Sequence, residues 1–161
     1  MNTRFVIARG ALAALLAGGI AVGPAVARAD DDGGRKTVIS TPLAPAAIGP
    51  YSQAIRVEKV VYLSGQIAID PATNQFMTGA SIADQTSRVL ENLAGVLTAA
   101  GLTLDDVVNT TVYLQDLNDF AAMNQVYATF FLNAPPARAT IQVAGIPRSG
   151  KVAISAIAVA P

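Results

Sequence analysis

Residues 133–143 read NAPPARATIQV, a segment that ends one predicted element and starts the next. The two adjacent prolines stop a helix, because proline lacks a backbone N–H and also restricts the residue before it. Polar and apolar residues then alternate, and a period of two places Arg138, Thr140 and Gln142 on one face of a strand. The segment therefore predicts a strand that begins at an arginine and carries this cation on its polar face.

Arg138 is the first candidate for a functional residue. A guanidinium held at the rigid start of a strand can grip a planar carboxylate through two parallel hydrogen bonds. The alternative is a solvated arginine in an ordinary surface ion pair, because most charged side chains lie in solvent. Thr140 lies on the same predicted face and is a second candidate.

The N-terminal residues 1–29 are typical of a secretory signal peptide. Basic residues precede an apolar run over 10–27, and small residues then alternate in the way that signal peptidase accepts. We expect cleavage before Asp30, with a cut after Ala27 as the alternative, and a periplasmic or secreted protein with no membrane contact once the signal is removed. An uncleaved anchor is disfavoured because the run is short and rich in Gly and Ala.

The remaining chain predicts a flexible acidic, glycine-containing lead-in at 30–36 and one domain over 37–161. Without residues 1–29 it carries 8 cations against 11 anions, a net charge of −3. A nucleic-acid partner is not expected, because such a surface needs clustered positive charge and these cations are scattered. The chain has no His and no Cys. The common zinc and copper sites and the nucleophiles that depend on histidine are therefore not expected, and neither is a cofactor.

Hydrophobic periodicity predicts an α+β domain with the order strand, strand, strand, helix, strand, helix, strand, strand. The predicted strands cover 37–39, 51–57, 60–69, 106–114, 139–143 and 151–159. One helix starts with a capping box at Ser81 and ends at Gly101, and the other is capped by Asn118. Gly65, inside the third strand, indicates a bulge or a close approach of another molecule to the backbone.

Two helices can cover only one face of such a sheet. We assign Ala54, Ile67, Val112 and Ile157 to the opposite face. This set is more apolar than a solvated face requires, so the sequence predicts self-association.

Five strings stand out once these elements are placed: APAAIGPYSQA at 44–54, SGQI at 64–67, NTTVYLQDLNDF at 109–120, PAR at 136–138 and ISAIA at 154–158. In this order they resemble the RidA family, also called YjgF, over almost the whole mature chain. The resemblance implies a chorismate-mutase-like fold, with a single mixed sheet covered on one face by two helices. It further implies a homotrimer with clefts between subunits, and hydrolysis of 2-imino or enamino acids to 2-keto acids and ammonia without metal or cofactor.

The resemblance also implies which residues form the site. Arg138 would grip the substrate carboxylate, while Tyr51, Ser64, the backbone of Gly65 and Asn124 would line the same cleft. Each has a simpler reading from the residues alone. Tyr51 could be a rim aromatic, Ser64 could satisfy a local backbone group, and Asn124 could cover the solvent side of its helix.

The last strand departs from the family pattern. Ala153 stands where members carry the glutamate that orients or activates the attacking water, and Ser155 replaces a second acidic residue. Losing a general base costs about 10²-fold to 10⁴-fold in rate, and Gln142 is no comparable base. Three functions remain open: an imine deaminase with weakened activity, a non-catalytic trimeric binding module for small carboxylates, and, more remotely, an endoribonuclease.

Overall fold

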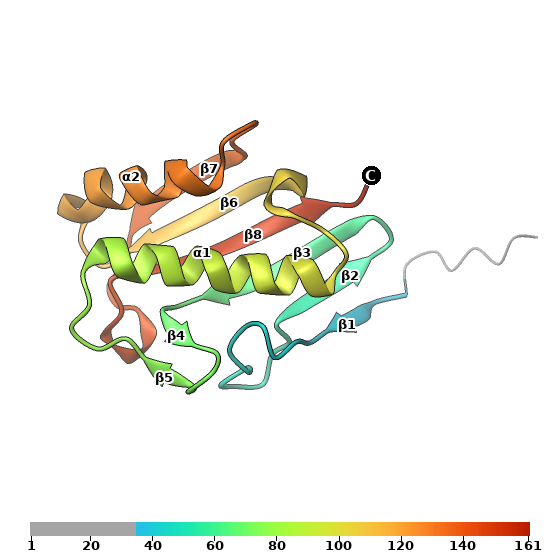
Figure 1. The fold of residues 1–161 in the computed structure, drawn as a ribbon, viewed down its shortest axis with the longest axis horizontal. Helices are drawn as coiled ribbons and strands as arrows, with labels where there is room; N and C mark the ends of the chain where they lie inside the picture. Colours follow the sequence, from blue (N-terminus) through green and yellow to red (C-terminus); the bar gives the residue numbers. More distant parts are fainter. Residues whose placement is uncertain (1–34) are drawn as a thin grey trace, which may run out of the picture. The chain divides into compact units, whose positions relative to one another are not determined.

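The structure is a computed structural model that describes residues 35–161. The predicted signal peptide, its cleavage site and residues 30–34 lie outside the described residues. The main layer is a six-stranded sheet in the order β1-β2-β3-β8-β6-β7 (Figure 1). Its strands are β1 Thr37–Ile39, β2 Ala54–Val57, β3 Val60–Gln66, β6 Val107–Leu114, β7 Ala137–Gln142 and β8 Val152–Val159. Only the β6–β7 pair is parallel, so the sheet is mixed, as predicted.

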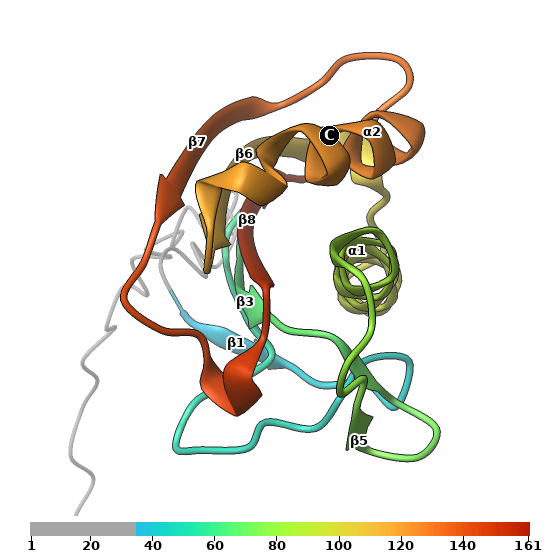
Figure 2. The same ribbon diagram turned by 90° about the vertical axis from the view of Figure 1, so that its left-hand side faces the viewer.

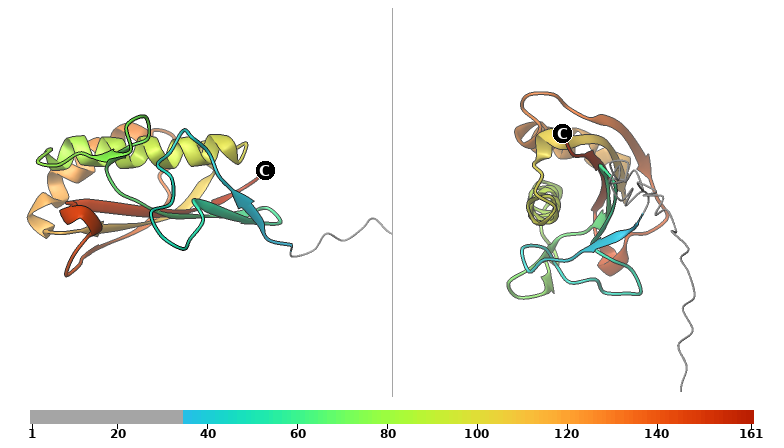
Figure 3. Two further views of the ribbon diagram at one scale, coloured as in Figure 1. Left: turned by 90° about the horizontal axis from the view of Figure 1, so that it is seen from below. Right: turned by 90° about the vertical axis from the view of Figure 1, so that its right-hand side faces the viewer.

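Both α-helices, α1 Ile82–Ala99 and α2 Phe120–Phe130, cover the same face of this sheet. Figure 2 views the layers end-on, with α1 and α2 on one side of β3, β8 and β6, and the left view of Figure 3 shows the same two layers from below. There are three short 3₁₀ helices in the described residues. η1 Leu104–Asp106 precedes β6, η2 Leu117–Asp119 follows β6, and η3 Pro147–Ser149 precedes β8. The predicted α+β layer architecture is confirmed.

The ends of α1 follow from local chemistry. The Ser81 hydroxyl accepts from the Asp84 backbone N–H at 3.1 Å and donates to the Asp84 carboxylate at 2.7 Å, which satisfies one free N–H of the first turn. After the helix, Gly101 adopts a φ of 72°, a left-handed conformation that glycine reaches at little cost. The predicted cap at Ser81 and the end at Gly101 are confirmed, but the capping box is incomplete, because the Asp84 carboxylate bonds to the Ser81 hydroxyl and not to its backbone N–H.

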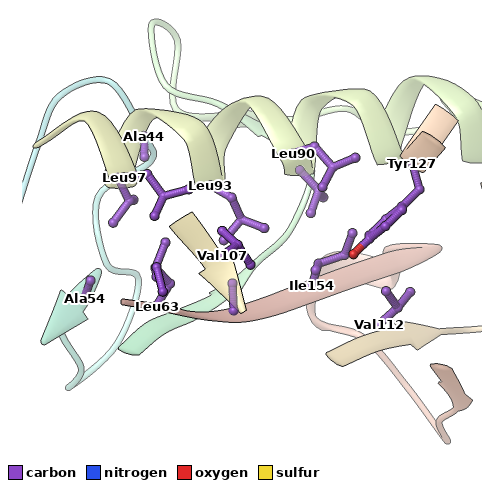
Figure 4. Packing of buried hydrophobic residues seen from close by; sticks show 14 of the residues in the cluster. Ala44, Ala54, Leu63, Leu90, Leu93, Leu97, Val107, Val112, Tyr127 and Ile154 are labelled. Carbon is purple, nitrogen blue, oxygen red and sulfur yellow. The ribbon is translucent and has the colours of Figure 1, made fainter. Parts of the chain in front are cut away.

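The hydrophobic core lies between the helices and the sheet. Leu90, Leu93 and Leu97 project from successive turns of α1 onto Leu63 of β3 and Ile154 of β8 (Figure 4). Each buried side chain of this size contributes roughly 1.5 to 3 kcal/mol relative to exposure. This packing holds α1 across the middle of the sheet.

The predicted faces of the strands are partly wrong. Ala54 and Val112 are 1% and 0% exposed and belong to the core beneath the helices. In β2 the larger apolar residues Ile55 and Val57 lie on the opposite face from Ala54, so alternation alone did not show which face the helices cover. Ile67 is also buried, in a small cluster with Ile69 and Ile146, because the register shift between Leu63 and Gln66 ends the simple alternation before it.

We call the side of the sheet away from the helices the open face. Among its residues are Ile55, Tyr62, Thr111, Tyr113 and Ile157, the last of which was assigned correctly. Tyr62 is 50% exposed and stands between Ile55 and Ile157 on the neighbouring strands.

Several element boundaries also differ from the predictions. The strand starting at Val60 ends at Gln66 instead of residue 69, and a separate two-stranded hairpin follows, formed by β4 Ile69–Asp70 and β5 Gln75–Phe76. Asn118 is not a cap: its backbone N–H donates to the Asp116 carboxylate at 2.9 Å, and Asp116 caps η2. The start of β7 at Ala137 places Arg138 inside the strand.

Candidate functional site

A cleft of about 440 Å³ opens between α2 and the beginning of β7. Its lining residues are Asn124, Tyr127, Ala128, Phe131, Pro135, Pro136 and Arg138. Phe131 ends α2 and the two prolines prevent further helix, so the chain turns back and enters β7 beside the helix it has just left. This turn brings Arg138 next to α2.

Arg138 has no carboxylate partner in the described chain. Within residues 35–161 the only ion pair is Arg88–Glu91, at 2.9 Å on the surface of α1. The Arg138 guanidinium instead lies over two aromatic rings, 4.6 Å from the ring centroid of Tyr127 and 5.9 Å from that of Phe120. A ring face attracts a cation without using its hydrogen-bond donors, so the guanidinium keeps N–H groups for an anionic ligand.

Tyr127 was not among the predicted site residues, yet it makes a specific polar contact. Its hydroxyl lies 2.7 Å from the Thr110 hydroxyl, and both residues are buried. Burial raises the pKa of Tyr127, while the hydrogen bond with Thr110 and the adjacent Arg138 guanidinium act in the opposite direction. The phenol is therefore neutral at physiological pH. A tyrosine on an apolar helix face, one turn after a polar Asn124, is the sequence signal that could have identified it.

Asn124 lines the same cleft, one helical turn before Tyr127. It is half-buried, so it does not simply cover the solvent side of α2. The structure thus brings two predicted residues, Asn124 and Arg138, into one site. An amide and a guanidinium at one cleft offer several donors to a carboxylate ligand.

Tyr51 and Gly65 lie in a different cavity, of about 70 Å³. The remaining lining residues are Pro45, Ala46, Ile48, Gln53, Gln66, Ile67, Ile69 and Pro147. The Tyr51 hydroxyl accepts from the Ile48 backbone N–H at 3.3 Å, and its side chain is 47% exposed. Tyr51 is thus an aromatic at a cavity rim, and within one chain it does not join Arg138 in a common cleft.

The sequence analysis did not single out Gln53, which holds the loop leading to Tyr51. Its side-chain amide donates to the carbonyls of Thr41, Ala44 and Pro45 at 3.0, 3.1 and 2.8 Å, and its carbonyl accepts from the Thr41 backbone N–H at 2.6 Å. Gln53 is buried, so water cannot reach these backbone groups of the loop. The side chain of Gln53 supplies the hydrogen bonds that they would otherwise lack. Gln53 therefore fixes the loop that carries Tyr51.

Ser64 and Gly65 sit at the predicted bulge of β3, which is confirmed by the register shift. The Ser64 hydroxyl donates to the Ser52 carbonyl at 2.7 Å, so Ser64 satisfies a local backbone group. A Cβ added to Gly65 would meet no atom within 4 Å. The space where a side chain would stand is therefore empty, and Gly65 is exposed.

Thr140 shares the face of Arg138, as predicted, but not its cleft. Its hydroxyl is buried without a hydrogen-bond partner in the described chain. Gln142, further along β7, accepts from the Leu117 backbone N–H at 3.2 Å and so is engaged in holding η2.

Ala153 and Ser155 lie on the open face of β8, opposite Tyr113 and Thr111 of β6. Ala153 is half-buried and packs against the cluster of Ile67, Ile69 and Ile146. This environment is apolar. In residues 35–161, no group of three or more acidic side chains could hold a metal ion, and no helix is long and apolar enough to cross a membrane.

Comparison with known proteins identifies the family. The model of the Endoribonuclease L-PSP family matches residues 41–160 of this chain. The chain belongs to this family. Its members include the YjgF gene product of E. coli, whose crystal structure is 42% identical, matches with a TM-score of 0.73, and covers 76% of this chain and 98% of its own. The predicted RidA/YjgF membership and the chorismate-mutase-like fold are thus confirmed.

Two further members of the family are informative about chemistry. The 2-iminobutanoate/2-iminopropanoate deaminase of Mus musculus is 48% identical over 124 residues, which cover 77% of this chain and 91% of the mouse protein. The crystal structure of E. coli TdcF with bound serine is 41% identical, has a TM-score of 0.74, and covers 78% of this chain and 99% of TdcF. Imine deaminases are therefore among the homologues of this chain.

Proposed function

We propose that this protein hydrolyses 2-imino and 2-enamino acids to 2-keto acids and ammonia, acting as an exported homotrimer. The observation that carries the proposal is the unpaired Arg138 guanidinium in the cleft between α2 and β7. Arg138 is exposed in the single chain, and a guanidinium at a cleft with no counter-ion in the described residues is suited to an anionic ligand. The name of the mouse relative and the serine bound to TdcF support a small α-amino or α-imino carboxylate as that ligand.

The chemistry requires little beyond binding and placement of water. With its carboxylate on Arg138, the imino acid presents its C=N carbon to a water molecule. Water adds to that carbon and one of its protons moves to nitrogen, which gives a carbinolamine. The remaining hydroxyl proton then also moves to nitrogen as the C–N bond breaks and the C=O bond forms, releasing ammonia and the 2-keto acid. The hydroxyl of Tyr51 and the exposed backbone of Gly65 are the groups we assign to the other side of the substrate.

The proposed trimer accounts for the separation of the predicted residues. Arg138 and Asn124 line one cavity, and Tyr51 and Gly65 line another. Each chain would then carry two half-sites, and a complete site would need one half from each of two neighbouring copies. The apolar open face supplies a surface on which copies can associate.

A second candidate function is a binding module for small carboxylates without turnover. The specific observation in its favour is Ala153, since no carboxylate stands at that position to activate water. A charge-assisted hydrogen bond contributes about 1.5 to 3 kcal/mol, so Arg138 can sustain binding without catalysis.

The test compares the wild type with Arg138→Met for two activities. The first is ammonia release from 2-iminopropanoate generated in situ, corrected for spontaneous hydrolysis in buffer. The second is calorimetric binding of 2-oxobutanoate. We expect Arg138→Met to weaken binding about 10- to 150-fold and to remove enzymatic hydrolysis.

The outcomes separate the two functions. Hydrolysis above the buffer rate that depends on Arg138 supports the deaminase. Binding that depends on Arg138, with hydrolysis at the buffer rate, supports the binding module instead. If Arg138→Met leaves both binding and hydrolysis unchanged, the assigned role of the arginine is wrong.

A further inference from the structure

We propose that Tyr127, anchored by Thr110, is a positioning residue that orients the Arg138 guanidinium for its carboxylate ligand. The inference rests on the proposed function and adds a named support to that site. It starts from the contacts of Arg138 itself. An arginine side chain has several rotatable bonds, and fixing it in one conformation on binding costs entropy unless the free protein already holds it.

The ring of Tyr127 supplies such a hold. The guanidinium carbon lies 4.6 Å from the ring centroid, within the range in which the ring face attracts a cation. Phe120 lies on the same guanidinium at the longer distance of 5.9 Å. Attraction to a ring face leaves the N–H edge of the planar guanidinium available, and this edge makes the paired bonds to a carboxylate.

Two contacts hold the Tyr127 ring in place. Its hydroxyl lies 2.7 Å from the Thr110 hydroxyl, and its side is packed on the Phe131 ring, with centroids 4.6 Å apart. Figure 4 shows the Tyr127 side chain reaching from α2 toward the sheet, and Tyr127 belongs to the same buried cluster as Ile154 and Val112. With only 5% of its surface exposed, this ring has little room to move.

The anchor and the arginine belong to adjacent strands. Thr110 of β6 is the register partner of Arg138 of β7, and both side chains lie on the helix-facing side of the sheet. The ring of Tyr127 therefore connects three elements. Its backbone is on α2, its hydroxyl is fixed to β6, and its face carries the cation from β7.

A purely structural role for Tyr127 predicts different behaviour. Core packing depends on the volume and burial of the ring, whereas attraction to a cation depends on the negative charge of the ring face. Fluorine substitution lowers that charge with little change in volume. A series of fluorinated rings thus separates the two roles.

The experiment replaces Tyr127 by phenylalanine and then by mono-, di- and trifluorophenylalanine in the full-length protein. The readouts are the Kd for 2-oxobutanoate, by calorimetry, and the Tm. We expect Tyr127→Phe, which loses the bond to Thr110, to raise the Kd about 2- to 10-fold, and the Kd to rise further with each added fluorine, by about 5- to 30-fold over the fluorinated series. The same series at Phe130, on α2 but outside the cleft, is the control and is expected to leave the Kd flat.

The outcomes distinguish this inference from the proposed function. If wild-type binding depends on Arg138 but the Kd does not change along the fluorinated series, the role of Tyr127 is refuted and the proposed function stands. If the wild type does not bind 2-oxobutanoate, or if Arg138→Met binds it equally well, both are refuted.

The anchor is tested separately at Thr110. Thr110→Val keeps the shape of the side chain and removes the hydroxyl, and Thr110→Ser keeps the hydroxyl. We expect Thr110→Val to raise the Kd about 2- to 10-fold and Thr110→Ser to restore most of the affinity. Equal affinity of the valine and serine variants would refute the anchoring role.

Discussion

At the scale of single residues, two positions matter most for the candidate site: Arg138, which carries a guanidinium, and Ala153, which lacks a carboxylate. Arg138 has its aromatic support and no counter-ion in the described chain. On the open face of β8, however, the position at which relatives are expected to carry a glutamate holds a methyl group among isoleucines. We therefore expect a change at position 153 to alter turnover while the carboxylate contact of Arg138 is kept.

Restoring the carboxylate tests this separation. We expect Ala153→Glu to raise the rate of 2-iminopropanoate hydrolysis by at least about 10-fold, because a positioned base contributes about 10² to 10⁴ in rate. Ammonia release at saturating substrate measures the effect. Ala153→Gln, similar in shape but uncharged at all pH values, is the matched control and should stay at the wild-type rate. An unchanged rate in the glutamate variant would mean that the missing base does not limit this protein.

At the scale of elements, α1 and the loop before β2 depend on each other. Gly95 lies inside α1, where glycine is a poor residue, and packs directly against the backbone of Leu43. Leu43 belongs to the loop that Gln53 holds through the carbonyls of Thr41, Ala44 and Pro45. The close contact of helix and loop thus contributes to the placement of Tyr51.

This contact reverses the ordinary expectation for a helical glycine. Helix propensity alone predicts that Gly95→Ala stabilises by about 1 kcal/mol. In the structure the added Cβ would run into the Leu43 carbonyl oxygen and approach its carbon at 2.9 Å. We therefore expect a loss of about 1 to 3 kcal/mol in the free energy of unfolding by urea. Ser87→Ala, half-buried on the same helix, should change it by less than about 0.5 kcal/mol. A stabilised Gly95→Ala would contradict the packing described.

At the scale of the whole molecule, the sheet leaves one face without a covering layer. Tyr62 of β3 is half-exposed there, between Ile55 and Ile157, and Val38 extends the apolar surface to β1. An apolar surface of this kind is typical of an interface between copies. The proposed trimer would bury it.

A charge at the centre of this face should prevent the association. We expect the wild type to sediment as a trimer and Tyr62→Glu to sediment as a monomer, because a buried carboxylate without a partner is costly. Ser87→Glu introduces the same charge on α1 and should leave the trimer intact. A monomeric wild type, or a trimeric Tyr62→Glu, would exclude the open face as the interface.

Local patterns were sufficient for most of the fold. Residue periodicity, the Ser81 cap and Gly101 at the end of α1 located both helices and the main strands, because caps and alternation act within a few residues. The strings around Tyr51, Ser64 and Arg138 indicated the family. Their order along the chain can be seen in the sequence without any knowledge of the structure. The small β4–β5 hairpin was missed, because two-residue strands carry no measurable period.

The sequence by itself thus determined the family, both helices and the main strands, and it singled out Arg138 as the candidate site residue. Only the tertiary structure decided that Ala54 and Val112 face the helices and that Gly95 contacts Leu43. It also decided that the Tyr127 ring contacts the Arg138 guanidinium while its hydroxyl bonds to Thr110. The physical reason is range. Propensity and alternation are properties of neighbouring residues, whereas burial and contact depend on which surfaces pack together across the chain.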